Sequence, residues 1–66
     1  MTRRALIEHL RRHGCALLRE GSRHSVFSNL RTGAQSSVPR HSEIGNRLAD
    51  KICKDLEVQK TGAQTH

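Results

Sequence analysis

An apolar residue recurs every four positions in the C-terminal third of this chain, at Ile44, Leu48, Ile52 and Leu56. Because an α-helix completes a turn in about 3.6 residues, this interval places the side chains on one helical face. The pattern predicts a helix over Glu43–Leu56, with Ser42 as its N-cap. Such a stripe needs another layer of the protein to cover it, so the rest of the chain must supply that layer.

A second helical pattern occupies Thr2–His13. Thr2 can cap its first turn, and Gly14 can end it in a left-handed conformation. Its apolar stripe consists of Leu6, Ile7 and Leu10, and the opposite side carries Arg4, Glu8, Arg11 and Arg12. A charged outer face is typical of a solvated helix, but a basic one can also contact nucleic acid, and the pattern leaves both interpretations open.

The segment between the two helices predicts three short antiparallel strands, Cys15–Arg19, His24–Leu30 and Gln35–Val38. Turns are indicated at Glu20–Ser22 and Arg31–Gly33, and Pro39 ends the last strand because proline cannot donate to a ladder. In the second strand Val26 and Phe27 lie on opposite faces, and the pattern leaves open which face is buried.

The order helix, strand, strand, strand, helix predicts an α+β fold in which both helices pack on one face of a three-stranded antiparallel sheet. This order on a small basic chain is that of double-stranded-RNA-binding domains. We expect one domain over residues 1–58 and a polar, disordered tail over residues 59–66. The expected core contains Leu6, Ile7, Leu10, Leu17, Leu18, Val26, Phe27, Val38, Ile44, Leu48, Ala49, Ile52, Cys53 and Leu56.

The 66 residues include 12 Lys or Arg against 6 Asp or Glu, which gives a formal net charge of +6 and favours a polyanionic partner. Phe27 is the only Phe, Tyr or Trp, which argues against a protein that stacks single-stranded bases on aromatic side chains. The longest aliphatic runs have three members, too few for a membrane span or signal peptide. We therefore expect a cytoplasmic chain with unbridged thiols at Cys15 and Cys53.

The most unusual segment is Gly21-Ser22-Arg23-His24, in which a tight turn brings a histidine and an arginine to the start of a strand. Histidine can exchange a proton near neutral pH, since its unperturbed pKa is roughly 6.5. Beside bound RNA, His24 could take the proton of a 2′-hydroxyl, and Arg23 could offset the charge on the phosphate. The alternative is that His24 is an exposed polar residue without a catalytic role, and spacing alone does not decide between the two.

A second basic run, Val38–Ile44, joins a strand to a helix. Arg40 and His41 within it could bind an anion at the helix N-terminus, or could belong to a simple surface loop. For a metal site, His9 and His13 stand four residues apart on one helix, a spacing that can present two imidazoles to zinc. The accompanying carboxylate or thiolate spacing is missing, so we expect no metal and no cofactor.

Three segments together resemble the HicA family of bacterial and archaeal toxins. They are Gly-Ser-Arg-His followed by Val-Phe, then Val-Pro-Arg-His-Ser-Glu-Ile, then Lys-Ile-Cys-Lys-Asp-Leu. The similarity spans roughly residues 3–58 and keeps the family's order and spacing. It implies a double-stranded-RNA-binding-domain-like fold, ribosome-independent endoribonuclease activity on messenger RNA, and inhibition by a HicB antitoxin as partner.

In that family the histidine of this turn is catalytic, which implies the same role for His24. Many members have a second histidine where this chain has Arg23, which keeps a positive charge, and Ser25 and Val26 stand where basic residues are common. We therefore expect RNA to be held by the helix arginines together with Arg23, Arg31, Arg40 and His41. The free toxin is expected to be a monomer. The alternative function is a non-catalytic double-stranded-RNA-binding module, in which His24 is only a surface residue.

Overall fold

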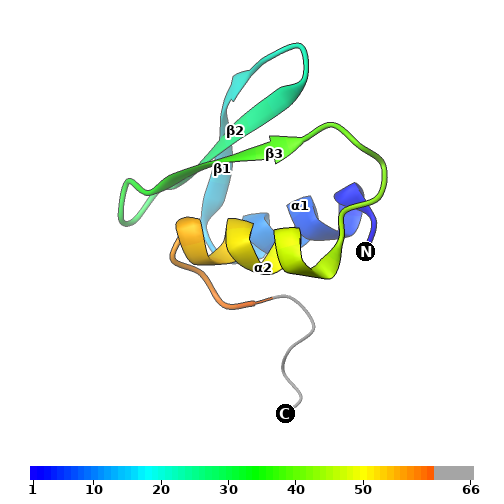
Figure 1. Cartoon of the computed structure of the whole chain (residues 1–66). Helices are drawn as coiled ribbons and strands as arrows, with labels where there is room; N and C mark the ends of the chain where they lie inside the picture. Colours follow the sequence, from blue (N-terminus) through cyan, green and yellow to red (C-terminus); the bar gives the residue numbers. More distant parts are fainter. Residues whose placement is uncertain (61–66) are drawn as a thin grey trace.

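The computed structural model describes residues 1–60, which form two helices and three strands (Figure 1). In chain order these are α1 (Arg3–Arg12), β1 (Cys15–Glu20), β2 (His24–Asn29), β3 (Gln35–Pro39) and α2 (Asn46–Asp55). Both helices lie on the same side of the sheet, so the predicted α-β-β-β-α fold is confirmed (Figure 1). Positions 61–66 of the predicted tail lie outside the described residues. Over residues 1–60, no helix has the length and apolar character that crossing a bilayer requires.

Helix α1 is capped at both ends as its sequence predicts. The Thr2 hydroxyl oxygen accepts a hydrogen bond from the N–H of Ala5 at 3.1 Å. After the helix, Gly14 takes a φ of +84°, in the left-handed region that glycine enters without steric cost. Leu6 and Leu10 are fully buried, so α1 presents the predicted apolar stripe to the core.

Helix α2 begins later than predicted. Ser42 is not its N-cap, since Gly45 holds that position and makes no side-chain capping bond. The N-terminal segment is the cause, because it pairs with the residues before α2. The N–H of Arg3 donates to the Ser42 carbonyl at 2.9 Å, and Met1 and Ile44 exchange hydrogen bonds of 2.8 and 3.0 Å. Between them Thr2 and Glu43 form an isolated antiparallel β-bridge, and the helix starts only at Asn46.

Strand β2 is the central strand of the antiparallel sheet, between β1 and β3. The pairing of β1 with β2 shifts by one residue between Leu17 and Arg19, which leaves Leu18 as a bulge. Because side chains alternate along a strand, such a shift changes the face on which every later residue lies. It brings Glu20 opposite Ser25, on the face of β2 that is buried.

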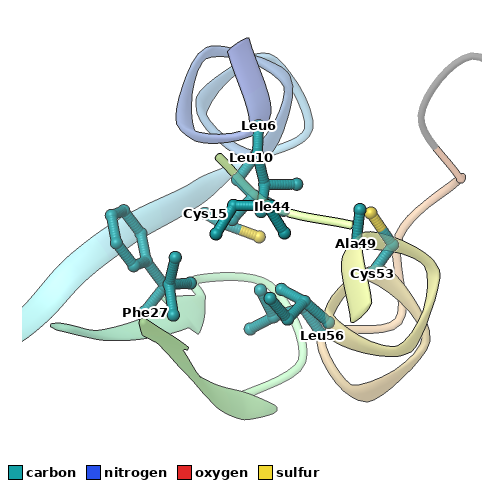
Figure 2. Packing of buried hydrophobic residues seen from close by; sticks show 10 residues of the cluster. Leu6, Leu10, Cys15, Phe27, Ile44, Ala49, Cys53 and Leu56 are labelled. Carbon is teal, nitrogen blue, oxygen red and sulfur yellow. The ribbon is translucent and has the colours of Figure 1, made fainter. Parts of the chain in front are cut away.

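The buried core lies between the sheet and the two helices (Figure 2). Its members are Leu6, Leu10, Cys15, Phe27, Val38, Ile44, Ala49, Ile52, Cys53 and Leu56. Phe27 rather than Val26 enters the core, which settles the face that the sequence pattern left open. The core prediction is wrong for Leu17, Leu18 and Leu48, which are 49%, 52% and 39% exposed. For the first two, the reason is that β1 is an edge strand and its hairpin with β2 projects beyond the helices (Figure 1).

Candidate functional site

His24 stands at the first position of β2, directly after the turn from β1. The N–H of Gly21 donates to the carbonyl oxygen of His24 at 2.8 Å, which closes the turn. A Cβ atom at position 21 would lie 3.0 Å from that same oxygen, so this close approach favours glycine. The His24 side chain is exposed, and it faces away from the core because its neighbour Ser25 points inward.

Three of the predicted RNA contacts lie at the same end of the sheet as His24. Arg23 is its chain neighbour, and the N–H of Arg40 donates to the Arg23 carbonyl at 3.2 Å. His41 comes next and is exposed. Pro39 is the cross-strand partner of His24, so the end of β3 delivers Arg40 and His41 to the turn.

Arg31 belongs to the connection between β2 and β3. This connection lies at the opposite end of β2 from the turn that joins β1 and β2 (Figure 1). Strand β2 has six residues, and the five steps of about 3.3 Å between them separate its two ends by roughly 17 Å. Arg31 and His24 are therefore too far apart to bind one phosphate group together.

Four polar side chains form a hydrogen-bonded group below the turn, here called the Glu20 cluster. They come from α1, β1, β2 and the segment after β3, and they are Arg3, Glu20, Ser25 and Arg40. Ser25 is 1% exposed, and its hydroxyl accepts from Arg3 Nη2 at 2.8 Å and donates to Glu20 Oε2 at 3.0 Å. Arg3 Nε also donates to the Pro39 carbonyl at 2.9 Å. The buried hydroxyl is thus satisfied as both donor and acceptor.

The Arg40 side chain is partly exposed to solvent, but it also makes hydrogen bonds within this cluster. Its Nη1 donates to Glu20 Oε2 and to the Gly21 carbonyl, the latter at 3.2 Å. Sequence reasoning missed the roles of Arg3, Glu20 and Ser25, because only the packing of α1 on the sheet and the pairing of the strands bring the four members together. An acidic residue directly before the turn, in a chain this basic, is the one local signal that could have pointed to Glu20.

Within residues 1–60, no three His, Cys, Asp or Glu side chains are grouped so that they could hold a metal ion. His9 and His13 do lie side by side, with ring centroids 4.3 Å apart. His9 Nε2 donates to the Gln59 carbonyl at 2.6 Å, and His13 Nδ1 donates to the His9 carbonyl at 2.9 Å. One ring nitrogen of each histidine is therefore used in a hydrogen bond to a backbone carbonyl.

A groove in the part of the chain that the structure describes does not include the turn that carries His24. An open groove of about 450 Å³ lies between β3 and α2, with Ser36, Leu48 and Lys51 in its lining and without His24. Small-molecule sites are typically concave and enclose most of their ligand. An exposed residue on a projecting turn is better suited to a polymer that lies across the surface.

Comparisons of this chain with protein-family models, with curated proteins and with solved structures gave no match. The function of the surface is therefore inferred from its chemistry. An exposed imidazole can accept or donate a proton near neutral pH, and the neighbouring guanidinium group of Arg23 can offset negative charge. Proton transfer next to charge stabilisation is the combination that cleavage of a phosphodiester requires.

Proposed function

We propose that this chain is a ribosome-independent endoribonuclease that cleaves messenger RNA with His24 as its catalytic residue, and that it acts as the toxin of a HicA-type toxin–antitoxin pair. The observation that carries the proposal is the exposed His24 beside Arg23, on a hydrogen-bonded turn of a chain with net charge +6. The resemblance of three sequence segments to HicA toxins supports it. The α-β-β-β-α order, which double-stranded-RNA-binding domains share, is consistent with it.

The proposed reaction uses a nucleophile that RNA itself carries. His24 removes the proton of a 2′-hydroxyl, the 2′-oxygen forms a bond to the adjacent phosphorus, and the bond from phosphorus to the 5′-oxygen breaks. The leaving oxygen takes a proton from water, which yields a 2′,3′-cyclic phosphate and a 5′-hydroxyl, and the hydroxide that remains takes the proton from His24. Arg23 offsets the charge that builds on the phosphate oxygens. No step in this scheme uses a metal ion, so cleavage is expected to continue in excess EDTA.

The basic residues hold the RNA in this proposal. Arg23, Arg40 and His41 contact phosphates near the cleaved bond, and Arg31 and the exposed arginines of α1 reach more distant ones. Because phosphate contacts release counterions, RNA affinity is expected to fall steeply with salt. A HicB-type antitoxin inhibits by covering His24 and these arginines, and the free toxin is a monomer that acts in the cytoplasm.

Substitution of His24 tests the catalytic assignment. His24→Ala is expected to abolish both growth arrest on expression and cleavage of messenger RNA by the purified chain. His13→Ala is the matched control, because it removes another exposed histidine, from the end of α1, and is expected to leave cleavage intact. Cleavage that survives in His24→Ala would show that another group performs the reaction.

The second candidate function is a non-catalytic double-stranded-RNA-binding module. The element order and the positive charge favour it, because neither requires a catalytic histidine. Product analysis separates the two functions. Strands that end in a 2′,3′-cyclic phosphate indicate the enzyme, and RNA that stays intact after long incubation indicates the binding module.

A further inference from the structure

We propose that the Glu20 cluster positions His24 for reaction. In this proposal the Glu20 carboxylate accepts hydrogen bonds from both sides of the cluster, from Ser25 on the sheet side and from Arg40 on the turn side. The inference rests on the proposed function, because it names positioning residues for the same site. Ser25 and Arg40 both donate to the single oxygen Oε2 of Glu20. Arg3 of α1 donates to the Ser25 hydroxyl. Glu20 therefore links the sheet side of the cluster, formed by Arg3 and Ser25, to the turn side, formed by Arg40.

Each half of the cluster holds one backbone neighbour of His24. On the turn side, Gly21 donates to the His24 carbonyl, and the carbonyl of Gly21 accepts from Arg40 at 3.2 Å. On the sheet side, Pro39 is the cross-strand partner of His24, and its carbonyl accepts from Arg3 at 2.9 Å. The main chain of His24 is thus fixed from two directions, although its side chain is exposed.

Ser25 fixes the direction in which His24 points. Consecutive side chains of a strand point to opposite faces, so a Ser25 hydroxyl held on the buried face turns the His24 imidazole toward solvent. The bulge at Leu18 is what brings Glu20 to the same face. The backbone that carries the His24 side chain is therefore held in place by hydrogen bonds. Such preorganisation raises the rate of reaction rather than the affinity for RNA.

Glu20 allows this positioning role to be separated from a general effect of charge. Glu20→Gln keeps nearly the same shape and removes one negative charge from a chain whose net charge is +6. A more positive surface binds RNA more tightly. If Glu20 acted through charge alone, the variant would cleave at an equal or higher rate. If Glu20 positions His24, the variant cleaves more slowly in spite of binding more tightly.

The experiment compares Glu20→Gln with Asp55→Asn, which makes the same chemical change in the exposed Lys51–Asp55 ion pair of α2. For Glu20→Gln we expect kcat for RNA cleavage to fall about tenfold with KM equal or lower, because small misplacements of a catalytic group cost this much or more. For Asp55→Asn we expect kcat within about twofold of the wild type. A kcat for Glu20→Gln equal to that of Asp55→Asn would overturn the proposal.

Amide hydrogen exchange gives a readout that does not depend on activity. The Gly21 N–H, which donates to His24, is expected to exchange roughly fivefold faster in Glu20→Gln than in Asp55→Asn or the wild type. Unchanged protection of the Leu10 amide, in the interior of α1, shows that the variant is folded. Gly21 exchange that stays at the wild-type rate would overturn the positioning role even if the chain cleaves no RNA. Absence of cleavage by the wild type counts against the proposed function alone.

Discussion

The side-chain amide of Asn29 donates a hydrogen bond to the carbonyl oxygen of Leu56 at 2.8 Å and so joins the end of β2 to the end of α2. Asn29 is 1% exposed. Its Oδ1 accepts from the backbone N–H groups of Arg31 and Thr32 at 2.9 and 3.3 Å. The buried Asn29 side chain therefore makes hydrogen bonds both within the β2–β3 hairpin and to the C-terminal end of α2.

Replacing Asn29 tests this connection. We expect Asn29→Leu to lower the free energy of unfolding by about 2–3 kcal/mol, because leucine is similar in size but leaves buried backbone groups without their partners. Urea denaturation followed by circular dichroism measures the loss. Asn46→Ala, at an exposed position, is the control and is expected to change the free energy of unfolding by about 0.5 kcal/mol or less. Equal losses in the two variants would contradict the role given to Asn29.

The N-cap of α2 offers a stabilising substitution. Gly45 has a φ of −65° and a ψ of 154°, which any residue can adopt, and an added Cβ would meet nothing within 4 Å. Gly45→Ser supplies the missing capping oxygen and restricts the unfolded chain, so the free energy of unfolding should rise by about 0.5–1 kcal/mol. Gly33→Ser is the matched control, since its φ of +84° should make the same change destabilising by about 1 kcal/mol. Thermal unfolding of both variants checks these opposite signs.

Stability at alkaline pH should depend on Cys15. Cys15 and Cys53 form no disulfide, as predicted, and both are buried; burial raises the pKa of Cys15 above its ordinary value. The unfolded chain therefore loses this proton at a lower pH than the folded chain does. The contribution of the thiol to stability is fully present below about pH 8 and is lost as the pH rises through the ordinary thiol pKa toward the raised one.

Cys15→Ala isolates that contribution. The free energy of unfolding of the wild type should decrease more steeply than that of Cys15→Ala between about pH 8 and 10, because only the wild type carries the Cys15 thiol with its raised pKa. Urea denaturation at a series of pH values measures both slopes. Parallel curves for the two proteins would show that the Cys15 thiol has the same pKa in the folded and unfolded chains.

The separation of Arg23 from Arg31 predicts different effects on RNA cleavage. Arg23→Ala should lower kcat by about tenfold, because it removes charge stabilisation next to His24. Arg31→Ala should leave kcat within about twofold and reduce the salt dependence of binding by about one phosphate contact. Kinetics with a labelled RNA over a salt series distinguish the two. A larger effect of Arg31→Ala on kcat would mean that the two ends of the sheet act on the same phosphate.

Local signals in the sequence are sufficient for both helices and for the turns. The four-residue apolar interval locates α2, and Thr2 and Gly14 mark the two ends of α1. Gly33 likewise takes a positive φ in the predicted β2–β3 turn. Each of these features depends on residues within about four positions of one another, so periodicity and backbone preferences are enough to find them.

The sequence by itself thus determined the element types, their order, and the glycine-serine-arginine-histidine turn that exposes His24. Only the tertiary structure decided that Ser42 lies before α2 instead of capping it, that Leu17 is exposed, and that Arg40 is tied to Glu20. These outcomes depend on contacts between distant positions, such as the Arg3–Pro39 bond across 36 residues and the Met1–Ile44 bond across 43. The physical reason is register: a bulge of one residue in β1 changes which side chains face each other, and no local pattern in the sequence records it.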